Sequence, residues 1–101
     1  MNPAVEWNQP FAVVDFETTG LRSSEGERVI EIAIVRLDGL NDQAPIRYSQ
    51  LINPQIPIPS ASTSIHGITD DMVASQPTFA SVADTVDRLI SGAVFVAHNA
   101  P

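Results

Sequence analysis

The stretch VDFETTGL at residues 14–21 places two acidic residues at the end of an apolar run. The residues before them, 11–14, are all apolar, which is typical of a central strand that is buried on both faces. Residues two apart on a strand point to the same face, with Cα atoms about 6.5–7 Å apart. Asp15 and Glu17 are therefore expected to direct their carboxylates to one side of this strand.

Two neighbouring carboxylates in such a place predict a divalent cation. Oxygen donors favour hard ions such as Mg²⁺ and Mn²⁺, and one carboxylate can bridge two ions about 3.5–4 Å apart. The common alternative for an arbitrary Asp-x-Glu is that both acids are hydrated at a strand end. The turn Thr18-Thr19-Gly20 favours the metal, because its amides and hydroxyls can bind a phosphate or a sugar edge.

The length of the chain is that of one domain and not two. The chain has 101 residues, and a chain of this size buries roughly 60–65% of its unfolded surface. Cysteine is absent, which excludes disulfides and thiolate metal sites. The sequence shows neither a membrane-spanning apolar run nor a signal-peptide pattern, so we expect a cytoplasmic location and no membrane contact.

The charge of the chain restricts how it can contact nucleic acid. Twelve acidic residues stand against five arginines, for a net charge of -7. Duplex affinity comes largely from neutralised phosphates, so the composition by itself disfavours general binding to nucleic acid. A contact with nucleic acid is therefore expected to be local and mediated by cations.

Apolar periodicity predicts an α/β fold with a mixed sheet. In the second strand, for example, Ile30, Ile32 and Ile34 alternate with other side chains. Short links suggest that the first three strands form an antiparallel meander, whereas the fourth follows a helix and should lie parallel to its neighbour. The predicted strands are residues 11–15, 28–37, 46–52 and 93–97.

Prolines and capping residues divide the segment between the third and fourth strands. Residues 53–62 contain three prolines and are predicted to form an extended crossing loop. Thr69 is expected to cap a short helix. An apolar stripe predicts a longer crossover helix over residues 79–91, with a cap at Thr78 and a stop at Gly92.

Five segments, in order along the chain, are VVDFETTGL, ERVIEIAIVRLDG, LINPQIPIP, IHGITDDMV and VAHNAP. Together they resemble the motifs of the DEDD superfamily of 3′-to-5′ exonucleases, most of all its proofreading epsilon-subunit branch. The resemblance implies a ribonuclease-H-like fold and hydrolysis at a DNA 3′ end, with two Mg²⁺ or Mn²⁺ ions in the complete domain. It also implies single-stranded DNA as substrate and a DNA polymerase or a fused downstream domain as partner.

The resemblance assigns roles to particular residues. Asp15 and Glu17 match the first two metal ligands and are the expected catalytic residues. The matched substrate-binding positions are Thr18, Thr19, Gly20, His66 and Asn99.

Several of these residues also fit purely structural roles. From the residues alone, His66 also fits a turn or packing histidine, and Asn99 fits a helix cap. Glu31 lies inside an apolar strand and matches a family glutamate without metal function, so we expect a structural role. His98 is not expected to be the general base, because the family's general-base histidine lies in a later motif.

The matching pattern stops inside the second exonuclease motif, at Pro101. In the family, the third and fourth acids and the general-base histidine follow further downstream. Residues 1–101 are therefore predicted to be the N-terminal portion of a single exonuclease domain, truncated at the C-terminal side and inactive or nearly so alone. Two alternatives stay open: a non-catalytic interaction module with the same fold, and an exonuclease that acts on RNA or short oligonucleotides.

Overall fold

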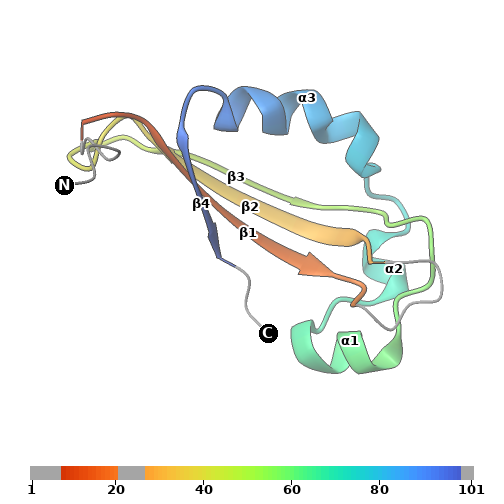
Figure 1. The fold of residues 1–101 in the computed structure, drawn as a ribbon. Coiled ribbons are helices and arrows are strands. Elements are labelled where there is room, and N and C mark those ends of the chain that lie inside the picture. Colours follow the sequence, from red (N-terminus) through yellow and green to blue (C-terminus); the bar gives the residue numbers. More distant parts are fainter. Residues whose placement is uncertain (1–7, 21–26, 99–101) are drawn as a thin grey trace.

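The computed structural model describes residues 8–20 and 27–98, which form one sheet and three helices (Figure 1). In chain order the elements are β1 (Phe11–Thr18), β2 (Val29–Leu37), β3 (Ile46–Leu51), α1 (Ser60–His66), α2 (Asp70–Val73), α3 (Phe79–Ile90) and β4 (Val94–His98). None of the helices in these ranges is long and apolar enough to cross a membrane.

The four strands lie in the order β3-β2-β1-β4. β2 pairs antiparallel with both β1 and β3, and β4 pairs parallel with β1. The predicted mixed sheet and the central position of β1 are thereby confirmed. β1 reaches Thr18, beyond the predicted end at Asp15, because its polar half still pairs with β2. The other strands agree with the prediction to within one residue at each end.

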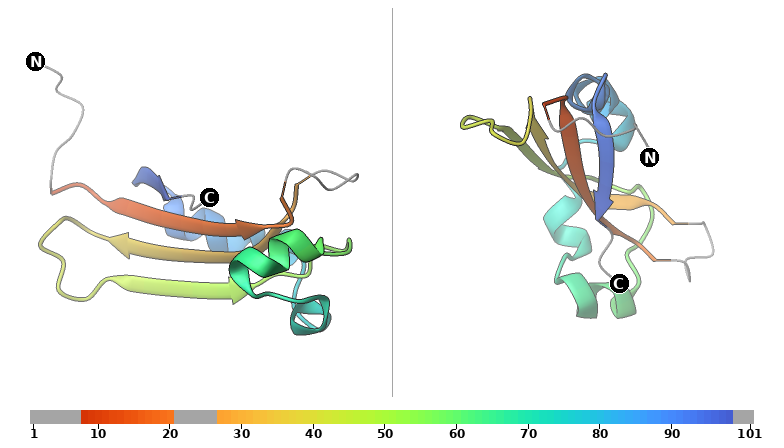
Figure 2. Two further views of the ribbon diagram at one scale, coloured as in Figure 1. Left: turned by 90° about the horizontal axis from the view of Figure 1, so that it is seen from below. Right: turned by 60° about the vertical axis from the view of Figure 1, so that its left-hand side comes forward.

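The two faces of the sheet carry different layers. Val14 and Phe16 of β1 pack in one cluster with Val82 of α3. Because side chains alternate along a strand, Asp15 and Glu17 lie on the face that points away from α3. Figure 2 shows α3 behind the sheet and α1 in front of it, at the ends of β1 and β3. The acidic face of β1 is therefore on the same side of the sheet as α1.

Buried aliphatic side chains hold the layers together. The cluster between the sheet and α3 consists of Val14, Ile32, Ile34, Ile52, Val82 and Val86. A second cluster joins β2 to the segments around α1 and α2 and consists of Ile30, Ile58, Ile68 and Val73. Full burial of one such side chain contributes about 1.5–3 kcal/mol. Residues 58 and 68 thus anchor the chain on both sides of α1.

Arg36 of β2 ties the end of α3 to the sheet. Its guanidinium donates hydrogen bonds to the carbonyl oxygens of Leu89 (2.9 Å) and Ser91 (2.8 Å). The last carbonyls of a helix lack partners within the helix and carry partial negative charge, so a cation stabilises them. The helix ends at Ile90, one residue before the prediction, and Gly92 follows with φ 70°.

The two predicted threonine caps differ in their contacts. Thr69 is confirmed as the cap of α2, and its side chain accepts a hydrogen bond from the Met72 amide at 3.4 Å. Thr78 occupies the cap position of α3 but forms no side-chain cap hydrogen bond. Packing of the apolar face of α3 against the sheet therefore stabilises the helix without this bond.

The prediction of an extended loop over residues 53–62 was wrong at its end, because α1 begins at Ser60. The sequence of α1, SASTSIH, is rich in residues of low helix propensity and has no side-chain cap. The helix ends instead in a left-handed Gly67, with φ 76°, whose amide donates to the Thr63 carbonyl at 2.7 Å. Tertiary contacts therefore form α1, and local propensity did not reveal it.

Candidate active site

The two acidic residues of β1 lie near its C-terminal end, where β1 pairs with its neighbouring strands. Asp15 is opposite Ala33 of β2 and beside His98 of β4 in the strand register. Glu17 is opposite Glu31 of β2. Asp15 and Glu17 are half-buried, as their position inside the sheet requires. The structure thus brings both predicted ligands to one face of the central strand.

The strand register changes directly after Glu17. Glu17 pairs with Glu31, but Thr18 pairs with Val29, so the β2 residue between them is passed over. This residue, Ile30, is fully buried in the cluster beneath α1 and α2. Such irregularities bend a strand and change the direction of its side chains. The irregularity separates the acidic stretch from the turn that follows it.

The turn after β1 is held by hydrogen bonds to the start of β2. The Thr19 amide donates to the Arg28 carbonyl at 2.8 Å, and the Thr19 hydroxyl accepts from the Arg28 amide at 2.9 Å. Thr19 is only 1% exposed. The Thr18 hydroxyl donates to the Glu27 carboxylate at 2.6 Å. Both hydroxyls thus already have partners in the protein, and their contact with substrate stays a prediction.

Gly20 has a conformation that other residues rarely adopt. Its φ is 86°, and a Cβ at this position would lie 3.0 Å from the Ser62 hydroxyl oxygen of α1. A glycine is therefore required here both by the backbone and by the close approach of the helix. Its predicted contact with a nucleotide is not tested by these observations.

His66 ends α1 and is held in one tautomer. Its Nδ1 atom accepts a hydrogen bond from the Ile68 amide at 3.0 Å, so the proton of a neutral ring is on Nε2. The Nε2 atom is buried and has no hydrogen-bond partner within the described residues. A neutral ring therefore has an N–H donor at this buried position, and its contact with substrate stays a prediction. Asn99, the remaining predicted substrate residue, lies outside the described residues.

The donor set for a metal ion is partial. Asp15 and Glu17 supply carboxylate oxygens from one face, which suits Mg²⁺ or Mn²⁺. Within residues 8–20 and 27–98, however, no group of three or more His, Cys, Asp or Glu side chains is arranged to hold a metal ion. The chemistry of the two acids fits a divalent ion, and their function as metal ligands stays a prediction.

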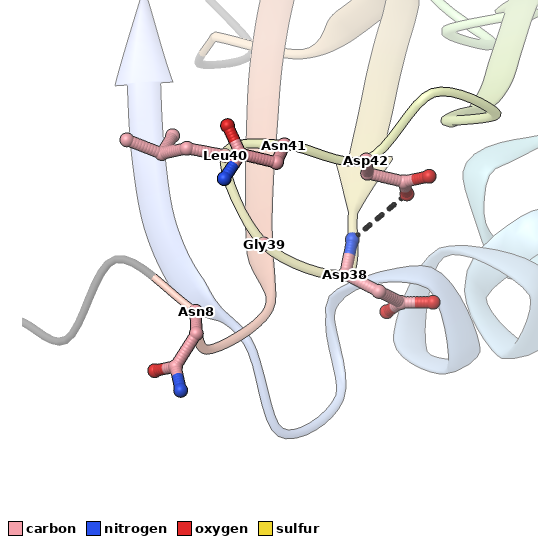
Figure 3. A pocket seen from close by; sticks show the side chains of 6 residues that line it. All are labelled: Asn8, Asp38, Gly39, Leu40, Asn41 and Asp42. Atoms are coloured by element: carbon pink, nitrogen blue, oxygen red, sulfur yellow. Dashed lines mark hydrogen bonds between the residues drawn. The ribbon is translucent and has the colours of Figure 1, made fainter.

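A hollow of about 540 Å³ lies at the other end of the sheet, away from the acidic residues. Figure 3 shows that it is formed by the turn between β2 and β3 and by the chain before β1. Asp42 closes this turn by accepting hydrogen bonds from the amides of Asp38 and Ala44, both at 2.9 Å. The same bonds hold the pKa of the Asp42 carboxyl below its ordinary value. The Asp42 carboxylate therefore stabilises this turn.

Three residues that the sequence analysis did not single out shape the site. Glu27 and Arg28 bind the two threonines of the turn, and the Ser62 hydroxyl donates to the Thr19 carbonyl at 2.6 Å. These contacts join residues that are nine and 43 positions apart. No local pattern in the sequence could have indicated them.

A comparison with protein families matches the chain to the RNase T family of exonucleases over residues 12–101. The chain therefore belongs to the RNase T exonuclease family. The resemblance drawn from the five sequence segments is confirmed at this level.

Curated relatives share this portion and extend well beyond it. The chain is 46% identical over 91 residues to a DNA polymerase III subunit epsilon-like protein of Rhodobacter capsulatus, covering 90% of the chain and 13% of that protein. It is 42% identical to the 3′-5′ exonuclease DinG of Bacillus subtilis, covering 90% and 10%. It is 42% identical to a DNA polymerase III subunit epsilon of Treponema pallidum, covering 96% and 44%. The chain thus spans less than half the length of each.

Solved structures confirm the fold. Exonuclease X in complex with 5′ overhanging duplex DNA is 30% identical with a TM-score of 0.64, covering 87% of this chain and 48% of that one. An apo structure of Exonuclease I has a TM-score of 0.72 at 18% identity, covering 91% and 21%. At that identity the likeness shows the fold alone. The predicted ribonuclease-H-like mixed sheet is confirmed.

Proposed function

We propose that the protein containing this chain is a metal-dependent 3′-to-5′ exonuclease that acts on a DNA 3′ end. The observation that carries the proposal is the placement of Asp15 and Glu17 on one face at the end of the central strand, on the side where α1 lies. Membership of the exonuclease family and the similarity to DinG and to an epsilon subunit of DNA polymerase III support the reaction type.

Asp15 and Glu17 are the residues that would hold the metal. A bound pair of Mg²⁺ or Mn²⁺ ions supplies an activated water and stabilises the charge on the phosphate. The half-buried position of the two acids raises their attraction for a cation, because charges interact more strongly where water is partly excluded. We assign them as catalytic metal ligands, with the remaining ligands outside the described residues.

The substrate end is assigned to the wall formed by the turn after β1 and α1. His66 offers the Nε2–H donor described above to an oxygen atom of the terminal nucleotide. Thr18, Thr19 and Gly20 fix the shape of the turn next to it. Asn99, which follows β4 in the sequence, is also proposed to contact the substrate.

A local site of this kind agrees with the acidic composition. Removing a nucleotide from an end requires contact with only a few nucleotides of single strand, and stacking and short-range contacts can supply it. With a net charge of -7, the chain is not expected to follow a long duplex. We propose that a polymerase or a fused downstream domain supplies the remaining affinity.

A non-catalytic module is the second candidate. It is favoured by one observation: in the described ranges no group of three or more His, Cys, Asp or Glu side chains is arranged to hold a metal ion. The two candidates predict different metal binding, because a non-catalytic module does not require a metal ion at Asp15 and Glu17.

The test measures release of mononucleotides from the 3′ end of labelled single-stranded DNA by the full-length protein that contains this chain. We expect release with Mg²⁺ or Mn²⁺, none with EDTA, and loss of release in Asp15→Ala. Asp38→Ala is the control, because Asp38 is an exposed acid at the opposite end of the sheet. RNA of the same sequence tests the oligonucleotide alternative. Activity that persists in Asp15→Ala, or no activity with either ion, would overturn the proposal.

A further inference from the structure

Ser62 links α1 to the end of β1 through a hydrogen bond that has no part in the helix itself. Its hydroxyl donates to the Thr19 carbonyl at 2.6 Å, across 43 positions of sequence. Ser64 of the same helix donates instead to the Ser60 carbonyl at 3.0 Å, within the helix. The two serines, which lie about half a helical turn apart, therefore form different hydrogen bonds, and of the two only Ser62 connects α1 to the turn after β1.

We propose that Ser62 is a positioning residue that sets the place of His66 relative to Asp15 and Glu17. This inference rests on the proposed function, in which His66 meets the substrate end and the two acids meet the metal. It goes beyond that function because it names the contact that fixes the distance between the two halves of the site.

Few other contacts hold α1 in place. The helix contains no buried residue, and its sequence has low helix propensity. Ile58 and Ile68 anchor the chain before and after it, which leaves the helix itself free to tilt about these two points. The hydrogen bond from Ser62 in α1 to Thr19 in the turn after β1 removes this freedom.

The Thr19 end of this bond is rigid. Thr19 is 1% exposed, and its amide and hydroxyl are bound to the backbone of Arg28. Gly20 lets the helix approach closely, because any Cβ there would lie 3.0 Å from the Ser62 hydroxyl oxygen. The Thr19 carbonyl is thus a fixed point in the turn after β1, two residues beyond Glu17.

The helix itself connects Ser62 to His66. Residues four apart in a helix lie on one face, so Ser62 and His66 share a face of α1. The ring of His66 is fixed to the end of the helix by the Ile68 amide at 3.0 Å, and the Thr63 hydroxyl donates to the Ile68 carbonyl at 2.7 Å. A movement of α1 therefore moves the imidazole with it.

The test compares three variants of the full-length protein: Ser62→Ala, Ser62→Thr and Ser64→Ala. In single-stranded DNA hydrolysis we expect Ser62→Ala to raise KM about fivefold and to leave kcat within about twofold, because an end-binding contact is lost. Ser62→Thr keeps the hydroxyl and should restore KM. Ser64→Ala should resemble the wild type. Affinity for Mn²⁺, measured by calorimetry, should be the same in all of them.

A second readout does not depend on nuclease activity. With ¹⁵N-labelled histidine, Ser62→Ala should shift the ring-nitrogen resonances of His66, whereas Ser64→Ala should not. Wild-type KM and an unshifted His66 in Ser62→Ala overturn the proposal. So does an equal loss of kcat, KM and Mn²⁺ binding that Ser62→Thr fails to restore, since this would indicate a purely structural role. If the wild type releases no nucleotide, the proposed function fails, and the His66 resonances still decide whether Ser62 positions the ring.

Discussion

Glu31 of β2 lies directly opposite Glu17 of β1 in the antiparallel register. Side chains in such a pair point to the same face with Cβ atoms about 4.5–5.5 Å apart, and like charges there are unfavourable by roughly 0.2–1 kcal/mol. Both residues are half-buried, which reduces screening by water. The sheet therefore contains an electrostatic penalty at the place where the proposed metal binds.

Replacing Glu31 by Gln should remove this penalty. Without divalent ions we expect the free energy of unfolding to rise by about 0.5 kcal/mol. With saturating Mn²⁺ the gain should shrink, because the ion already offsets the charge of Glu17. Denaturant unfolding in EDTA and in Mn²⁺ measures both values.

Asp84→Asn is the control for the Glu31 substitution, because it removes an exposed charge on α3, away from the acidic face. It should give the same small change under both conditions. A loss of stability in Glu31→Gln would contradict this prediction. It would show that the Glu31 carboxylate forms a favourable contact, in agreement with the structural role expected from the sequence.

Gly20→Ala should destabilise the protein more than Gly92→Ala. Both glycines have positive φ, 86° and 70°, but a Cβ at Gly92 meets nothing within 4 Å, whereas one at Gly20 meets Ser62. The backbone conformation alone costs about 1–2 kcal/mol, and the contact adds to this at Gly20. In a Ser62→Ala background the additional cost should fall.

A double-mutant cycle in thermal unfolding measures this coupling between Gly20 and Ser62. We expect about 0.5–1 kcal/mol. Strict additivity of the two substitutions would mean that α1 does not press against the turn, contrary to the distance in the structure.

The sequence predicted the sheet because its signals are local and strong. The alternation in β2 and the capping of α2 by Thr69 depend on residues within a few positions. The pair Asp15 and Glu17 could be placed on one face for the same reason. The helix α1 could not be predicted, since SASTSIH has low intrinsic propensity and the hydrogen bond that Ser62 donates has its acceptor, the Thr19 carbonyl, outside the helix.

The roles of the two threonines show a further limit of the sequence. Thr18 and Thr19 are the same residue type, yet their side chains form different contacts. The Thr19 side chain is buried and accepts a hydrogen bond from the Arg28 amide, whereas the Thr18 hydroxyl donates to the Glu27 carboxylate. The difference arises from the change of register after Glu17, which the sequence does not show. The pairing of strands, rather than the residue types, thus determines which hydroxyl lies at the surface of the site.

Asp42 should make stability depend on acidity at the far turn. Its pKa is lowered from the ordinary value of 3.8 by hydrogen bonds from the amides of Asp38 and Ala44. A lowered pKa in the folded state means that the contribution is present above the unfolded value and is lost as the pH falls through the folded value. The difference between wild type and Asp42→Asn should therefore be seen at pH 7 and shrink below about pH 3.8. A difference that is constant from neutral pH down to acid unfolding would show that the charge of Asp42 has no part in the turn (Figure 3).

The two nitrogen atoms of His66 can be tested separately. His66→Asn places an amide oxygen near the position of Nδ1, where it can still accept from the Ile68 amide, but it lacks the Nε2–H donor. We therefore expect stability close to that of the wild type and a KM for single-stranded DNA raised about fivefold, with Mn²⁺ affinity unchanged. His66→Ala removes both nitrogens and leaves the Ile68 amide without its acceptor, which costs about 1–3 kcal/mol. If His66→Asn instead binds DNA as the wild type does while His66→Ala is destabilised, the histidine serves only to close the end of α1, as the packing interpretation of the sequence holds. If both variants raise KM equally and only His66→Ala loses stability, the Nε2–H donor is the group that meets the substrate.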